Sequence, residues 1–213
     1  MKKFPYYFSI EKKIKVKIFI IGKHSIGKYT TSKLLEEKGV KVARVFSNRP
    51  PEMMDANPYL DKDYRYLETQ DIHNLFETKS CLFLGSDPHG EFYVGLDFME
   101  LDKNEVFFLS PNQFLELDEK MIREEVLVIW VDATYEYRLR RYFNNQLEYN
   151  FEQVEAFEEI YDGQFMESYY NKLKSTSHFT EDLYFINEEP NRLAAIIYSI
   201  LKDPNIIDLY KEE

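Results

Sequence analysis

Gly22-Lys23-His24-Ser25-Ile26-Gly27-Lys28 is the stretch that decides the fold class of this chain of 213 residues. It directly follows the apolar run 16–21, and the stretch 30–38 behind it predicts a helix that ends at Gly39. The two flanking glycines allow the backbone to curl with its N–H groups pointing inward, and the helix start adds the positive end of its dipole. Strand, glycine-flanked loop and helix in this order predict a phosphate-binding loop rather than a plain strand-to-helix turn.

Lys28 is expected to reach the outer phosphates of a bound nucleoside triphosphate. The residue after this lysine is usually Ser or Thr, but here it is Tyr29, and Thr30 occupies the position after that. We therefore expect the donor nucleotide to be bound by the whole loop and by the first residues of the helix. These residues are Gly22, Lys23, His24, Ser25, Ile26, Gly27, Lys28, Tyr29 and Thr30.

The composition excludes several classes of protein. With 44% hydrophobic and 16% aromatic residues, the chain is predicted to form one domain with a substantial core. A net charge of −11 disfavours general nucleic-acid binding, which needs a basic face. No apolar run approaches the length of a membrane span, and the single cysteine, Cys81, excludes an internal disulfide and suits a reducing cytoplasm. We expect a cytoplasmic protein, a monomer or homodimer, without nucleic-acid or membrane partners.

Short apolar runs alternate with helical stretches along the chain, which is the pattern of a parallel sheet flanked by helices. The near-continuously apolar runs predict five core strands, at 16–21, 40–46, 106–109, 126–131 and 183–186. The runs 81–85 and 91–95 instead predict an antiparallel hairpin. Helices are expected at 30–38, 69–79, 112–124, 134–145, 151–173 and 190–202. Thr69 is placed as an N-cap, and Pro111 and Pro190 mark helix starts.

Several further motifs follow the loop in order. They are Ser47-Asn48-Arg49-Pro50-Pro51, Asp63-Tyr64-Arg65-Tyr66, Gly90-Glu91-Phe92-Tyr93-Val94-Gly95, Arg138-Leu139-Arg140-Arg141 and Leu183-Tyr184-Phe185-Ile186-Asn187-Glu188-Glu189. In this order they resemble the acceptor loop, the Asp-Tyr-x-Phe segment, the Gly-x-Tyr-Tyr-Gly hairpin, the helix before the lid and the adenine-side turn of the guanylate kinase family of nucleoside monophosphate kinases. The resemblance covers most of residues 15–203.

The resemblance implies an α/β fold of the P-loop NTPase class. We expect a parallel five-stranded core sheet flanked by helices, with a small inserted acceptor-binding hairpin region and a short lid. The whole chain, 1–213, would then be one domain. Its core would comprise 14–46, 105–141 and 152–203, the insertion 47–104, and the lid about 142–151.

The resemblance also implies a reaction, in which ATP with Mg²⁺ phosphorylates a nucleoside monophosphate. Such a transfer depends on positioning and on neutralising charge. Lys28 would hold the donor phosphates, Arg49 would clamp the acceptor phosphate with its planar fork, and Arg141 would approach the transferring group as the lid closes. These three form the expected catalytic set. Ser47 and Tyr64 would help to bind the acceptor, and Asn187 would lie near the adenine.

Each of these roles has a plainer alternative. Arg49 could anchor a proline turn, Tyr64 could be a packing residue, and Arg141 could belong to a solvated helix face paired with Glu136 or Glu148. Asp132, which follows a buried strand, is a candidate helix cap or a contact for magnesium-bound water. The histidines show no metal-ligand spacing, so no dedicated protein metal site is expected.

The departures from the family concern the acceptor. Glu52 stands where a second acceptor arginine is usual, and Arg65 is a candidate replacement. No arginine occurs between Tyr142 and Asn191. The stretches that would read guanine are Leu82-Phe83-Leu84, Leu96 and Leu109-Ser110-Pro111, which carry no carboxylate. Unpaired donors on a buried guanine are costly. We therefore expect an altered base specificity. The alternative is a catalytically weak scaffold that binds a nucleotide or a peptide, and a GTPase switch is disfavoured because no Asn-Lys-x-Asp motif is present.

Overall fold

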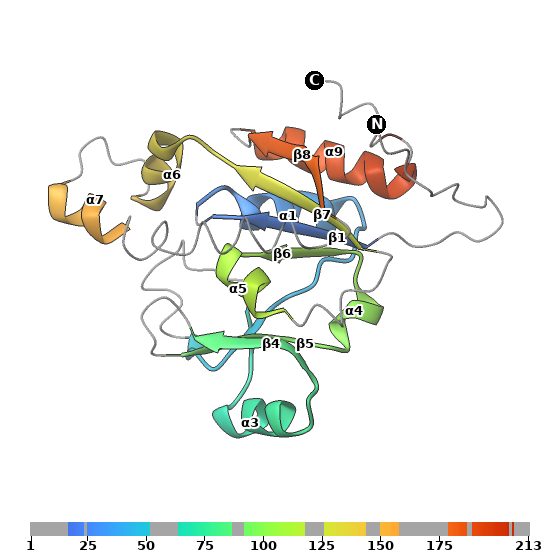
Figure 1. The fold of residues 1–213 in the computed structure, drawn as a ribbon, viewed down its shortest axis with the longest axis vertical. Coiled ribbons are helices and arrows are strands. Elements are labelled where there is room, and N and C mark those ends of the chain that lie inside the picture. Colours follow the sequence, from blue (N-terminus) through green and yellow to red (C-terminus); the bar gives the residue numbers. More distant parts are fainter. Residues whose placement is uncertain are drawn as a thin grey trace.

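A computed structural model describes residues 17–23, 25–51, 64–86, 92–117, 126–143, 150–157, 179–186, 189–204 and 206. These residues form two four-stranded sheets with helices packed around and between them (Figure 1). Parts of the predicted elements lie outside this description, namely 118–124 and 158–173 of two helices, the hairpin turn 87–91 and most of the lid, 144–149.

The first sheet is wholly parallel. Its strand order is β6 (Val106–Leu109), β1 (Lys17–Gly22), β7 (Val126–Asp132) and β8 (Phe179–Ile186). Side chains of β1 alternate between two buried clusters, with Ile18 and Ile20 in one and Phe19 and Ile21 in the other. Because both faces of this sheet are covered, its strands are apolar at successive positions, as the sequence predicts.

Helices cover the two faces of the first sheet. On one face, α1 (Lys28–Glu37) and α9 (Pro190–Lys202) contribute Leu35 and Leu193 to the same apolar cluster as Ile18. On the other face, α5 (Pro111–Glu116) contributes Phe114 to the cluster of Phe19. α5 begins with a capping box, since Ser110 and Gln113 each accept a backbone N–H of the other. Pro111 and Pro190 open their helices as predicted.

The predicted fifth core strand is not found among the described residues. The segment 40–46 makes a single parallel bridge, Val42 with Val106, beside which the Ala43 N–H donates to the Val106 carbonyl at 2.8 Å. It then leaves the first sheet, and its last residue belongs to β2 (Phe46–Ser47) in the second sheet. The apolar side chains of Ala43 and Val45 are packed against the cluster between the sheets. Because these side chains pack against the core, the segment 40–46 has the apolar pattern of a core strand without forming one.

The second sheet has the order β3 (Arg65–Tyr66), β2, β5 (Tyr93–Asp97) and β4 (Cys81–Ser86). The predicted hairpin is confirmed, because β4 and β5 pair in antiparallel fashion. β2 is parallel to β3 and antiparallel to β5. α5 and the short α4 (Glu100–Lys103) lie between this sheet and the first one (Figure 1). One apolar cluster contains residues of both sheets and of both helices, so the two sheets share a core.

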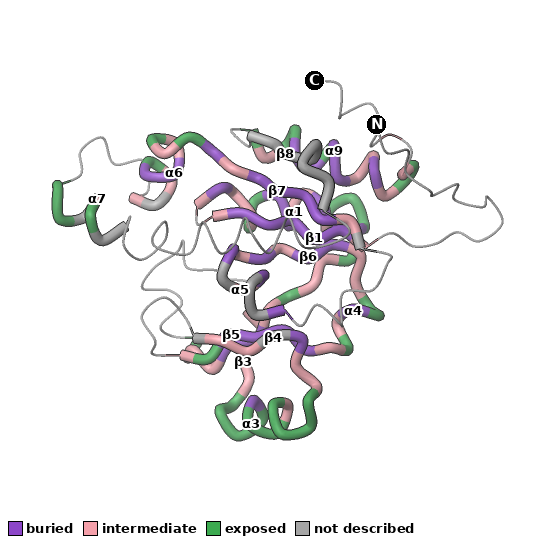
Figure 2. Tube along the Cα trace, in the orientation of Figure 1, coloured by how far each residue is buried: buried purple, intermediate pink, exposed green. Residues whose placement is uncertain are grey.

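α3 (Thr69–Glu77) covers the outer side of the second sheet, and Figure 2 shows that most of it is exposed. Its one buried residue is Ile72. The helix begins at Thr69 with Glu68 as its N-cap, so the prediction of Thr69 as the cap is wrong. The Thr69 hydroxyl accepts instead from Asn48 Nδ2 at 2.9 Å.

The remaining helices are α6 (Tyr135–Tyr142) and α7 (Phe151–Phe157). α6 follows β7 after two residues, with Thr134 as its N-cap. No helix in the described part of the chain is long and apolar enough to cross a membrane.

Candidate nucleotide-binding site

The loop between β1 and α1 has the backbone conformation of an anion-binding turn. Ser25 and Gly27 both have positive φ, at 60° and 95°, on either side of Ile26. Such left-handed residues curl the chain so that backbone N–H groups converge. Gly27 is also the N-cap of α1 and offers no capping side chain, so the first N–H groups of the helix lack a side-chain partner from that position. The loop therefore presents donors and a helix start to one place.

Both glycines of the motif are needed for close contacts. A Cβ at Gly22 would collide with the Ile26 side chain and would lie 2.6 Å from the Val131 carbonyl oxygen on β7. A Cβ at Gly27 would collide with the guanidinium of Arg141, whose Cζ would lie 3.1 Å away. The first glycine thus lets the loop pack on the sheet, and the second lets a cation approach the loop.

Lys28 is the first residue of α1 and folds back over the loop. Its Nζ donates to the carbonyls of Gly22 at 2.9 Å and Lys23 at 2.7 Å. The ammonium group therefore joins the end of β1 to the start of α1. Its positive charge lies within the loop, where it can exchange a carbonyl partner for a phosphate oxygen.

Arg141 brings a second positive charge to the same loop from α6. Its Nη1 donates to the Ser25 carbonyl at 3.3 Å, and its Nη2 donates to the Tyr137 hydroxyl at 2.7 Å. Its Cζ lies 4.1 Å from the centre of the Tyr137 ring. Burial lowers the pKa of Arg141 below its usual value, and Tyr137 partly opposes that shift. The group stays charged at neutral pH, because arginine is so strongly basic.

Other predicted residues of the loop region are less engaged. Tyr29 is 41% exposed and Thr30 is also exposed, on the solvent side of α1.

Asp132 ends β7, next to Val131, which is paired in register with Gly22. Its Oδ1 accepts the Ala133 N–H at 2.8 Å, while Thr134 is the N-cap of α6, so Asp132 does not cap this helix. It stands instead at the end of the strand beside the loop. His24 and Asn187 lie outside the described residues.

Two of the predicted acceptor residues, Ser47 and Arg49, lie at the carboxyl end of β2. Ser47 is buried, and its hydroxyl accepts the Arg49 N–H at 3.1 Å. The Cζ of Arg49 lies 5.4 Å from the centre of the Phe92 ring. Within the described part of the chain, no carboxylate pairs with Arg49, and its Nε is buried without a hydrogen-bond partner. Tyr64 is half-buried directly before β3. Arg49 is thus held by an aromatic ring, which leaves its guanidinium available to an anion.

Asn48 fixes the backbone between Ser47 and Arg49. Its Oδ1 accepts the Tyr93 N–H at 2.8 Å, and its Nδ2 donates to the Thr69 hydroxyl. One side chain therefore links the end of β2 to the hairpin and to the start of α3. Sequence reasoning did not single out this residue, because its two partners are distant along the chain.

The strand directions place the two groups of residues on one side of the molecule. β2 runs in the same direction as β4, since both are antiparallel to β5. In Figure 1 the carboxyl ends of β1, β7 and β4 all point to the left. The loop after β1, the helix after β7 and the segment after β2 therefore leave their sheets on the same side.

Comparisons with known proteins agree with this architecture. No protein-family model and no curated protein matches the chain. Among solved structures, it is similar to the crystal structure of a guanylate kinase from Anaplasma phagocytophilum, with a TM-score of 0.53 and 16% sequence identity. The match covers 91% of this chain and 87% of that one. This chain has a guanylate-kinase-like fold.

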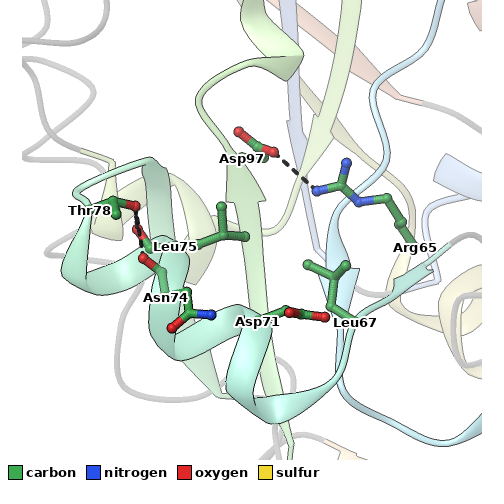
Figure 3. A pocket seen from close by; sticks show the side chains of 7 residues that line it. All are labelled: Arg65, Leu67, Asp71, Asn74, Leu75, Thr78 and Asp97. Carbon is green, nitrogen blue, oxygen red and sulfur yellow. Dashed lines mark hydrogen bonds and ion pairs between the residues drawn. The ribbon is translucent and has the colours of Figure 1, made fainter.

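Within this guanylate-kinase-like fold, Arg65, the candidate replacement for a second acceptor arginine, is paired with carboxylates. It bonds to the Asp97 carboxylate at 3.2 Å and lies 3.6 Å from that of Glu100. Figure 3 shows it on the wall of a pocket of about 410 Å³ that is also lined by Asp97 and by α3 residues such as Asn74. Asp97 is only 9% exposed and requires a cationic partner. Arg65 therefore neutralises the buried carboxylate of Asp97 on β5 and lies near the partly buried carboxylate of Glu100 on α4.

The stretches expected to face the acceptor base are filled with apolar side chains. Leu82, Leu96 and Leu109 are each at most 3% exposed. They pack in one cluster with Phe114 of α5 and Trp130 of β7. These leucines therefore belong to the hydrophobic core between the two sheets.

Proposed function

We propose that this protein is a nucleoside monophosphate kinase that transfers the γ-phosphoryl group of ATP to a (deoxy)nucleoside monophosphate, with a base specificity other than the usual one for guanine. The observation that carries the proposal is the loop between Gly22 and Lys28, over which Arg141 lies. A curled backbone, a helix start and two cations at one place suit a polyphosphate better than they suit a structural turn.

The chain's own residues fit the phosphates of ATP. The loop N–H groups would bind the inner phosphates, and Lys28 would exchange one of its carbonyl partners for an outer phosphate oxygen. Mg²⁺ bound with ATP would supply charge neutralisation for the phosphates. Asp132, at the strand end beside Gly22, is the carboxylate that we assign to the metal's water shell.

The acceptor would approach from the second sheet. Arg49, held over Phe92, would form two parallel hydrogen bonds with the acceptor phosphate. Ser47 ends β2, Tyr64 directly precedes the neighbouring β3, and both would contribute hydroxyl groups to that phosphate's surroundings. Arg141 would then stabilise the group in transfer, while closure of the segment after α6 would exclude water.

The altered base specificity rests on the stretches 82–84, 96 and 109–111, which contain no carboxylate. Guanine offers N–H donors that need acceptors in a buried site. Leu82 and Leu96 supply none and are already packed in the core. The acceptor base would therefore be held by shape and by few polar contacts, which favours a smaller or less polar base.

A coupled assay of ADP release tests the proposal directly. ATP with Mg²⁺ would be offered together with each common ribonucleoside and deoxyribonucleoside monophosphate in turn. We expect release that depends on one or a few acceptors and is lost in Lys28→Ala. ADP release that no acceptor stimulates would contradict the proposal of a kinase.

The second candidate is a guanylate-kinase-like scaffold with little turnover. The closed packing around Leu96 and the lack of a second acceptor arginine favour it. The scaffold would bind ATP in the same assay conditions without acceptor-dependent ADP release, and Arg49→Ala would change nothing in its nucleotide binding.

A further inference from the structure

Tyr137 lies one helical turn before Arg141 on α6, so the two side chains share one face of the helix. The tyrosine contacts the guanidinium in two ways, through its hydroxyl and through its ring. We propose that Tyr137 is a positioning residue, which holds the Arg141 guanidinium over the phosphate loop so that it meets the outer phosphates of ATP. This inference rests on the proposed function, because it assigns a role within the same donor site.

The two hydrogen bonds of Arg141 differ in strength. The bond to Tyr137 is short, at 2.7 Å, whereas the bond to the Ser25 carbonyl is 3.3 Å. The longer one is beyond the usual range for N–H···O bonds. A phosphate oxygen offers a shorter, charge-assisted bond to the same Nη1. Arg141 can therefore exchange Ser25 for a phosphate while Tyr137 keeps its other nitrogen in place.

Tyr137 is itself held firmly. Its ring packs against the apolar cluster that contains Leu35 of α1 and Ile129 of β7. β7 leads into α6 after two residues, and its Val131 is paired with Gly22 at the start of the loop. The loop and the tyrosine are therefore anchored to adjacent strands. Such an arrangement gives the arginine little freedom to move away.

The other arginines of α6 do not share this position. Arg140 pairs with Glu136 on the exposed side of the helix. Arg138 is buried, with its guanidinium 5.6 Å from the centre of the Tyr135 ring. Arg141, by contrast, donates to the Ser25 carbonyl of the phosphate loop. Of these three arginines, Arg141 is thus the one at the i+4 position from Tyr137.

A mutant cycle tests the role of Tyr137. Binding of ATP with Mg²⁺ would be measured by calorimetry for the full chain and for Tyr137→Phe, Tyr137→Leu, Arg141→Ala and the double variant Tyr137→Leu/Arg141→Ala. We expect Tyr137→Phe, which keeps the ring, to weaken binding about threefold, and Tyr137→Leu about tenfold or more. In the Arg141→Ala background, Tyr137→Leu should cost no further affinity, because the two residues act as a unit.

Tyr198→Phe is the matched control. Tyr198 also contacts cations, with Lys38 and Lys202 each within 5.5 Å of its ring centre, but it lies on α9 away from the loop. Its variant should bind ATP like the wild type. In the ADP-release assay, Tyr137→Phe should lower kcat and raise the KM for ATP, while the KM for the acceptor stays unchanged. A loss of folded protein would lower the apparent kcat alone and leave both KM values unchanged.

The outcomes separate this inference from the kinase proposal. An equal loss from Tyr137→Leu with and without Arg141, or unchanged ATP affinity in folded Tyr137→Leu, would overturn the role of Tyr137. If Tyr137→Leu does not fold, unchanged affinity and kcat in Tyr137→Phe would overturn it. If the chain binds ATP without acceptor-dependent release, only the kinase proposal fails, and the binding cycle still decides on Tyr137. If the chain binds no ATP, both fail.

Discussion

The phosphate loop and the end of β2 both carry candidate phosphate-binding cations, but they hold them differently. In the loop, Lys28 and Arg141 donate to backbone carbonyls of the loop itself. At the end of β2, Arg49 rests on the Phe92 ring, and no carboxylate in the described part of the chain pairs with it. The donor side is thus built on backbone geometry, whereas the acceptor side depends on one side chain.

This difference has a consequence for specificity. A loop that binds through N–H groups and glycines tolerates few substitutions, because its contacts are too close for added atoms. A site made of side chains can change its ligand when those side chains are replaced. We therefore expect the donor to be ATP and the acceptor to be the variable partner.

The largest effect is expected for Lys28→Ala. Removing this ammonium should weaken ATP binding on the order of 100-fold, since a preorganised charge at a phosphate contributes about 3 kcal/mol. Lys33→Ala is the control, because Lys33 lies on the same helix but pairs with Glu36. Calorimetry with ATP and Mg²⁺ measures both. Equal ATP affinities in Lys28→Ala and Lys33→Ala would contradict a special role of Lys28 in phosphate binding.

Gly27→Ala should have the next largest effect. Its φ of 95° strains any residue with a Cβ, and the added methyl group would displace Arg141. We expect the free energy of unfolding to fall by about 1–3 kcal/mol and ATP binding to weaken as well. Gly39→Ala is the matched control, because Gly39 also has positive φ, but a Cβ there meets no atom within 4 Å. It should lose stability without losing nucleotide affinity. Similar affinities in the two variants would argue against Arg141 as a loop ligand.

Arg49, which follows β2, and Arg65, which lies on β3, should respond in different ways. Arg49→Ala should raise the KM for the acceptor about tenfold and leave ATP affinity unchanged, because it removes a charged phosphate contact. Arg65→Ala should instead lower the free energy of unfolding by about 1–2 kcal/mol, because it leaves Asp97 without its cation. Steady-state kinetics and urea unfolding measure the two effects. A raised acceptor KM in a folded Arg65→Ala variant would show that our separation of their roles is wrong.

The smallest effects concern two buried hydroxyls. The Thr31 hydroxyl on α1 is buried without a hydrogen-bond partner among the described residues, so Thr31→Val should be neutral or stabilise by up to about 1 kcal/mol. The Ser47 hydroxyl accepts the Arg49 N–H, so Ser47→Ala should destabilise by about 1 kcal/mol. Thermal unfolding of both variants checks the signs. If both variants changed stability in the same direction, hydrogen bonding of these hydroxyls would not determine their contribution to stability.

Local patterns predicted the elements around the loop Gly22–Lys28 well. Adjacent residues determine the order of strand, loop and helix around Gly22 and Lys28, and the structure has these elements in that order. The hairpin was predictable for the same reason. The fifth strand was not, because an apolar run such as 40–46 is equally suited to burial beneath a neighbouring sheet. Sequence alone does not say which sheet covers it.

The acceptor side illustrates what a sequence pattern leaves open. Arg65 directly follows Tyr64, but successive side chains of a strand point to opposite faces, so proximity in sequence did not place it at the acceptor. Its partners Asp97 and Glu100 are more than 30 residues away along the chain. Tyr137 was within reach of prediction, since its spacing of four from Arg141 puts both on one helix face.

The most direct test of the account is binding of bisubstrate analogues, in which adenosine is joined through five phosphates to one of the common nucleosides. We predict that at least one such analogue binds more tightly than ATP, and that both Lys28→Ala and Arg49→Ala weaken its binding. That result would mean that the loop and the end of β2 bind one ligand simultaneously. Affinities no tighter than that of ATP for every analogue, all unchanged in Arg49→Ala, would contradict the claim that the two regions form one phosphoryl-transfer site.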